Sequence, residues 1–66
     1  MNILLNNKSE TLIDGTTVEK LLHNKNIKNK YFAVEINRKI IPKSIYCRHI
    51  INDGDRIEII TVIGGG

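Results

Sequence analysis

Arg56-Ile57-Glu58-Ile59-Ile60-Thr61-Val62 is the most strand-like stretch of the chain, because isoleucine, valine and threonine favour extended backbone. Ile63-Gly64-Gly65-Gly66 follows it directly. Glycine loses more conformational freedom on folding than any other residue, so a run of glycines is not expected to form a helix or a strand. We therefore expect a strand that projects a thin, flexible tail, with a free α-carboxylate on Gly66.

Two simpler explanations of the glycine tail compete with a functional one. In the first, the tail is a frayed terminus; in the second, it is a flexible linker. Features elsewhere in the chain have to decide between these two explanations and a tail whose carboxylate takes part in a reaction.

Length and charge exclude several classes of protein. The chain has 66 residues, which limits it to one domain with little room for an internal pocket. Its net charge of +3 comes from ten Lys and Arg against seven Asp and Glu, spread along the sequence. This spread is typical of a solvated surface, and the few aromatic residues do not alternate with basic ones as a base-stacking surface requires. We expect no nucleic-acid partner.

The single cysteine, Cys47, excludes an internal disulfide and indicates a reducing compartment. No signal pattern opens the chain, because Asn6 and Asn7 interrupt the first apolar residues, and no apolar run reaches the ~20 residues of a membrane span. We expect a soluble, cytoplasmic protein without a membrane partner, monomeric when free. Cys47 is predicted to be a small buried core residue; the alternative is a sulfur relay.

Turn signals and apolar periodicity predict the order strand, strand, helix, strand, short strand, strand. Thr16 and Glu19 have the spacing of a capping box, and Val18, Leu21 and Leu22 form one apolar stripe of the helix that follows. The helix is expected to end near residues 24–26, and Lys43 to His49 to form a helical turn or irregular crossover. The predicted strands cover residues 1–5, 8–13, 31–37, 40–41 and 56–62, with turns at Asn6-Asn7 and Arg38-Lys39.

The first and last strands are apolar and are predicted to pair at the centre of an α+β sheet, with the helix across one face. In the last strand, Ile57, Ile59 and Thr61 alternate with Glu58, Ile60 and Val62. If Ile57 and Ile59 face the helix, Ile60 and Val62 point to the other side, where exposed apolar residues indicate a partner surface. The alternative is that a crossover loop covers them.

No catalytic or metal-binding constellation is visible in the sequence. His23 and His49 lack ligand partners at the spacing of a metal site. We therefore expect no bound metal or cofactor and no enzymatic activity of the chain itself.

The sequence resembles the ubiquitin-like β-grasp sulfur carriers, and most closely the thiamine-biosynthesis sulfur carriers of the ThiS family. The resemblance covers essentially the whole chain. It implies a mixed sheet of about five strands with one main helix, in a domain of residues 1–62, followed by a flexible tail of residues 63–66. The matching segments are Ile3-Leu4-Leu5-Asn6, Thr17-Val18-Glu19-Lys20-Leu21-Leu22, Val34-Glu35-Ile36-Asn37-Arg38-Lys39-Ile40-Ile41-Pro42, Asp53-Gly54-Asp55-Arg56-Ile57-Glu58-Ile59 and Gly64-Gly65-Gly66.

The resemblance also implies the chemistry. An adenylating enzyme uses ATP to activate the carboxylate of Gly66, sulfur from a cysteine-derived persulfide converts it to a thiocarboxylate, and thiazole synthase receives that sulfur. Gly64 and Gly65 would form the thread that enters a narrow channel, and Ile60, Val62 and Ile63 the surface that binds partners. The family often ends in two glycines and this chain has three, which lengthens the thread.

Three other functions share these features. The small subunit of molybdopterin synthase and a tRNA-thiolation carrier have the same tail and fold, although the molybdopterin subunits tend to be longer. A ubiquitin-like interaction module with an inert tail is the third.

Overall fold

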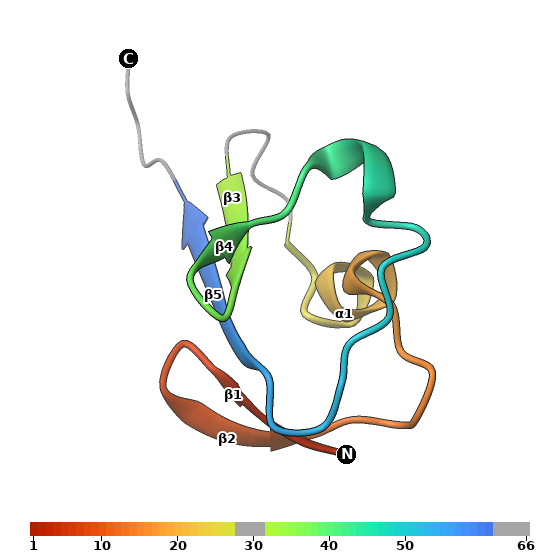
Figure 1. The fold of residues 1–66 in the computed structure, drawn as a ribbon, viewed down its shortest axis with the longest axis vertical. Coiled ribbons are helices and arrows are strands. Elements are labelled where there is room, and N and C mark those ends of the chain that lie inside the picture. The colour runs from red at the N-terminus through yellow and green to blue at the C-terminus, as the bar shows by residue number, and fades with distance from the viewer. Residues whose placement is uncertain (28–31, 62–66) are drawn as a thin grey trace.

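The chain folds into one mixed sheet and one α-helix. The computed structural model describes residues 1–27 and 32–61. Figure 1 shows the sheet on one side of the molecule and the helix packed against one of its faces. The described elements are β1 (Asn2–Leu5), β2 (Lys8–Thr11), α1 (Val18–Asn24), β3 (Phe32–Ile36), β4 (Lys39–Ile40), the 3₁₀ helix η1 (Lys43–Ile45) and β5 (Arg56–Thr61).

The five strands lie in the order β2-β1-β5-β3-β4. The first and last strands are neighbours at the centre, as the sequence predicted, and β1 pairs with β5 in parallel. The other three pairings are antiparallel. The result is the predicted α+β, ubiquitin-like β-grasp arrangement, in which β5 lies between the β1–β2 hairpin and the β3–β4 hairpin.

Both hairpins turn through two consecutive residues with positive φ, the backbone that matches strand twist. Asn6 and Asn7 have φ of 50° and 68°, which confirms the first predicted turn. The second turn was predicted one residue too late, because it consists of Asn37 and Arg38, with φ of 53° and 69°. The first of these is an asparagine, a residue type that tolerates positive φ.

The helix begins one residue later than the predicted capping box. Thr17 is the N-cap, and its hydroxyl oxygen accepts a hydrogen bond from the Lys20 amide at 3.1 Å. The predicted cap, Thr16, instead donates its hydroxyl to the Ile13 carbonyl at 2.6 Å. Glu19 does not complete a capping box, because its amide donates to the Tyr46 carbonyl at 3.0 Å. Carbonyls from the crossover segment therefore set where the helix starts.

The core lies between α1 and the sheet. Val18, Leu21 and Leu22 are all buried, which confirms the predicted stripe. On the sheet, alternate residues of each long strand point toward the helix, and Val34 and Ile57 are fully buried. The buried apolar residues are Ile3, Leu5, Val18, Leu21, Leu22, Val34, Ile36, Ile41, Tyr46, Ile51 and Ile57.

The segment after η1 corrects the prediction for Cys47, which is exposed rather than buried. Ile45 is partly buried against the core and Tyr46 is buried. Successive residues of a tight helical turn are rotated by roughly 100–120°. When Ile45 and Tyr46 both face inward, the next side chain must therefore point outward. Burial raises the pKa of the Tyr46 hydroxyl, while a hydrogen bond with the Val34 backbone acts in the opposite direction.

Candidate functional site

The strand that leads to the glycine tail is held on both sides. On one side, five residues of β5 pair with β3, from Ile57 opposite Ile36 to Thr61 opposite Phe32. On the other side, β1 pairs through Leu4 and Leu5. β3 therefore flanks β5 as far as Thr61, whereas β1 flanks only its first two residues, Arg56 and Ile57. β5 is the blue arrow that points toward the top of the sheet in Figure 1.

Asn6 extends this support beyond the end of β1. Its amide donates to the Ile57 carbonyl at 2.9 Å, and its side-chain oxygen accepts from the Ile59 amide at 2.9 Å. The side chain thus replaces a further residue of β1 in the ladder. The sequence predicted Asn6 only as a turn residue, and nothing in the local pattern indicates its contact with a strand more than fifty positions away.

A second group of hydrogen bonds fixes the start of β5. Asp55 is buried, and its two carboxylate oxygens accept from the Asn37 side-chain amide at 3.0 Å and the Asn52 backbone amide at 2.9 Å. Asn37 also accepts from the Arg56 amide at 3.0 Å. This network joins the β3–β4 turn to the first residue of β5. The sequence did not reveal it, because Asn37 lies 18 positions from Asp55 and 19 from Arg56.

The face of the sheet that α1 does not cover, called the open face below, carries exposed apolar side chains. Ile57 is fully buried and Ile60 is 46% exposed, which agrees with the first of the two alternatives that the alternation along the strand left open. The described part of the crossover therefore leaves Ile60 accessible. Leu4 and Ile40 are also exposed on this face, at 36% and 70%, and were not singled out from the sequence. Leu4 lies inside a continuous apolar run, which hides the alternation.

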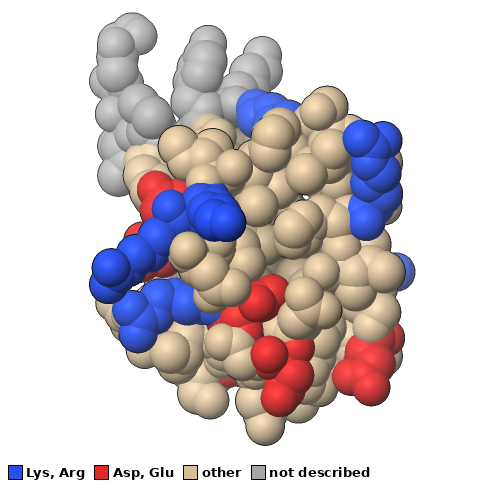
Figure 2. Space-filling view, viewed as in Figure 1, with Lys and Arg blue, Asp and Glu red and all other residues tan. Residues whose placement is uncertain are grey.

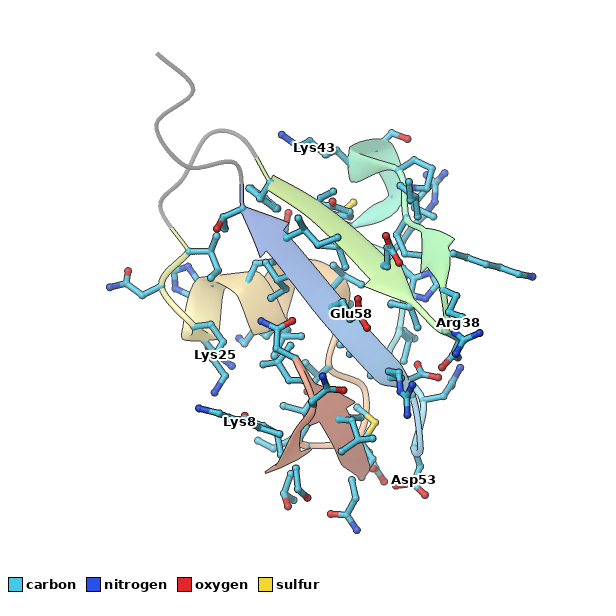
Figure 3. All side chains as sticks on the ribbon, turned by 90° about the vertical axis from the view of Figure 1, so that its left-hand side faces the viewer. Lys8, Lys25, Arg38, Lys43, Asp53 and Glu58 are labelled. Atoms are coloured by element: carbon cyan, nitrogen blue, oxygen red, sulfur yellow. The ribbon has the colours of Figure 1, made fainter. Side chains whose placement is uncertain are left out.

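Figure 3 looks onto the open face, with β5 crossing its centre and α1 behind the sheet. Glu58 lies at the middle of β5, and Arg38 lies at the end of the β3–β4 hairpin. In Figure 2, which shows a different side, the lysines and arginines lie in separate groups. They do not form one continuous stripe on that side.

The other predicted site residues lie outside the described residues. These are the proposed site of chemistry, Gly66, the thread residues Gly64 and Gly65, and the surface residues Val62 and Ile63. The predicted boundary between residues 1–62 and 63–66 lies there too. The binding role of Ile60 stays a prediction, although its exposure is established.

Side chains able to hold a metal do not gather in the described part of the chain. Within residues 1–27 and 32–61, no three His, Cys, Asp or Glu residues lie close enough to bind one ion. In the same residues, no helix has the length and apolar character needed to cross a membrane.

Known proteins resemble this chain along its whole length. It is 36% identical over 66 residues to "Sulfur carrier protein ThiS" of Escherichia coli (strain K12), and the match covers all of both chains. It is 39% identical over 66 residues to a "Thiazole synthase" of Paramagnetospirillum magneticum. The second match covers the whole chain but only 20% of the relative, so the chain spans about a fifth of that protein.

Solved structures agree with the sequence comparison. The crystal structure of the thiamine biosynthesis protein ThiS from Geobacter metallireducens superposes with a TM-score of 0.86, at 28% identity, over all of both chains. The sequence pattern of the ThiS family matches residues 3–66, which includes the central strand and the glycine tail. The chain therefore belongs to the ThiS family.

Proposed function

We propose that the chain is a sulfur carrier for thiazole formation in thiamine biosynthesis, and that Gly66 is the residue that carries the sulfur. The observation that supports this most strongly is the full-length likeness to the Escherichia coli sulfur carrier. In the sequence the three glycines come two residues after the end of β5, which β3 pairs as far as Thr61, so a partner that binds the domain also fixes where β5 ends.

The chemistry follows from the weakness of a carboxylate as an electrophile. A carboxylate oxygen of Gly66 attacks the α-phosphorus of ATP in an adenylating enzyme, and pyrophosphate leaves. A persulfide sulfur then attacks the carbonyl carbon and expels AMP, which gives an acyl disulfide. Cleavage of its S–S bond by a thiol leaves the thiocarboxylate, whose sulfur passes to thiazole synthase. The carrier acts as a co-substrate and not as a catalyst, and ATP is bound by the adenylating enzyme.

Each partner has its own support. The thiazole synthase of Paramagnetospirillum magneticum includes a region similar to this chain, which supports thiazole synthase as the recipient of the sulfur. The adenylating enzyme and the persulfide source are proposed from the chemistry alone. Ile60, with Val62 and Ile63, is proposed to bind the adenylating enzyme, because burial of an exposed isoleucine on binding is favourable.

Genetics tests the pathway, and the tail variants test the site. Deletion of the gene should cause a requirement for thiazole that the wild-type gene relieves. Addition of one residue after Gly66 converts its carboxylate to an amide and should abolish this rescue. Gly65→Val should also fail, because a β-branched side chain restricts the backbone and does not fit a narrow channel. Growth of the deletion strain without thiazole would contradict the pathway, and rescue by the extended chain would contradict the role of Gly66.

A further inference from the structure

Two glutamates occupy directly opposite positions on neighbouring strands of the open face. Glu35 of β3 is the direct partner of Glu58 of β5. The Asn37 amide donates to the Arg56 carbonyl, and the alternation of an antiparallel ladder then makes Glu35 and Glu58 a hydrogen-bonded pair, with Cα atoms about 5.5 Å apart. Their neighbours Val34, Ile36 and Ile57 are buried, so both glutamates point away from the core.

This arrangement is unfavourable within the domain. Like charges directly opposite each other on a sheet destabilise it. Among the described residues, neither carboxylate has an ion pair or a side-chain hydrogen bond. Arg56 lies on the same face two residues before Glu58, yet no ion pair joins the two. The chain thus keeps an uncompensated pair of charges where a neutral pair would be more stable.

The apolar residues of the open face surround this pair. Ile40 lies beside Glu35 in β4, and Ile60 with its partner Ala33 forms the adjacent row toward the tail. A protein surface that covers Ile60 and Ile40 must also cover the two carboxylates between them. Removal of an unpaired carboxylate from water is strongly unfavourable. A partner that docks here therefore has to supply positive charge at this position.

We propose that the adenylating enzyme places an arginine side chain, within an apolar surface, against both carboxylates of the Glu35–Glu58 pair. A guanidinium is planar and presents five N–H donors, so one arginine reaches two carboxylates. The contact relieves the repulsion and neutralises the pair as the surrounding isoleucines are buried. This inference rests on the proposed function, because it names the chemistry by which the proposed partner recognises the open face.

The test compares two double variants that lose the same charge. Glu35→Gln/Glu58→Gln removes the pair, whereas Asp14→Asn/Glu19→Gln removes two exposed acidic residues from the loop before α1 and from α1 itself. Affinity for the adenylating enzyme of the same organism is measured by titration calorimetry at low and high salt. Turnover is measured as ATP–pyrophosphate exchange, and folding by thermal melting.

We expect Glu35→Gln/Glu58→Gln to lower the affinity about tenfold or more and to weaken its salt dependence. Its melting temperature should be equal to that of the parent or higher, and exchange at a saturating concentration should be unchanged, because the tail is intact. The control variant should bind within about twofold of the parent. Glu58→Lys supplies a cross-strand cation opposite Glu35, so it should raise the melting temperature while weakening binding further.

A loss of affinity without a loss of stability is the signature of a binding role, because removal of structurally important residues would lower both. Affinity of Glu35→Gln/Glu58→Gln equal to that of the control variant would overturn the inference while leaving the proposed function intact. If the wild-type chain itself supports no exchange, the proposed function fails, and the inference fails with it.

Discussion

Ile57 and Ile60 lie on one strand and differ in the face that they occupy, so their truncation to alanine should have different consequences. Ile57 is fully buried against the helix side of the sheet. Ile57→Ala removes three buried carbons, worth about 0.8 kcal/mol each, and leaves a cavity, for a total of about 3–4 kcal/mol. A domain of this size is stable by only about 3–5 kcal/mol, so the variant should be largely unfolded at 37 °C.

Ile60→Ala should cost much less stability. Its side chain is 46% exposed, so only about half of the same transfer energy, about 1 kcal/mol, is lost on truncation. The exposed part is the part that a partner would cover. The affinity for the adenylating enzyme should therefore fall by about fivefold, equivalent to about 1 kcal/mol, in a variant that remains folded.

Urea denaturation followed by circular dichroism measures the stability loss of each alanine variant. Each loss is read from the shift in the urea midpoint, with the same dependence of unfolding free energy on urea concentration for all variants. If Ile57→Ala has no measurable folded baseline, Ile57→Val provides the comparison, with an expected cost of about 1 kcal/mol. A loss of stability for Ile60→Ala that equals or exceeds the loss for Ile57→Ala would refute the assignment of faces. A slip of one residue exchanges the two sides of a strand and would reverse the two costs.

Three further predictions concern other parts of the domain. Asp55→Ala should cost about 2–4 kcal/mol in urea denaturation, because two donors lose their charged acceptor; a loss below about 1 kcal/mol would contradict the network. Cys47→Ala should change stability by less than about 0.5 kcal/mol and should retain sulfur transfer in a reconstituted assay, since the side chain is exposed; loss of transfer by the folded variant would make Cys47 a relay. The raised pKa of Tyr46 means that the unfolded chain loses the phenolic proton at a lower pH than the folded chain does. Stability should therefore fall as pH rises above about 10, and Tyr46→Phe should remove that part of the decrease. A pH profile unchanged by Tyr46→Phe would contradict this.

The elements set by local chemistry were predictable from the sequence. Alternation in the last strand indicated that Ile57 and Ile60 lie on opposite faces, and two adjacent asparagines predicted the first hairpin turn. The central pairing of β1 with β5 also followed from the apolar character of the two strands.

The features that depend on distant partners were not predictable. Thr17 replaces Thr16 as the cap because the amide of Glu19 donates to a carbonyl of the crossover. The side-chain oxygen of Asn6 accepts a hydrogen bond from the Ile59 amide of β5, 53 positions away in the sequence. The facing of Glu35 and Glu58 requires the register between β3 and β5, and a pattern within one strand does not contain that register.

The intact mass of the native protein, isolated from cells under conditions that preserve thioacids, tests the central claim most directly. We predict a fraction of chains that end at Gly66 and are heavier than the unmodified chain by the difference between one sulfur and one oxygen atom. Fragmentation should place this difference on Gly66, and alkylation by a thiol reagent should shift the same fraction. A chain that continues beyond Gly66, or one that ends there and shows no sulfur when cells are making thiazole, would contradict it.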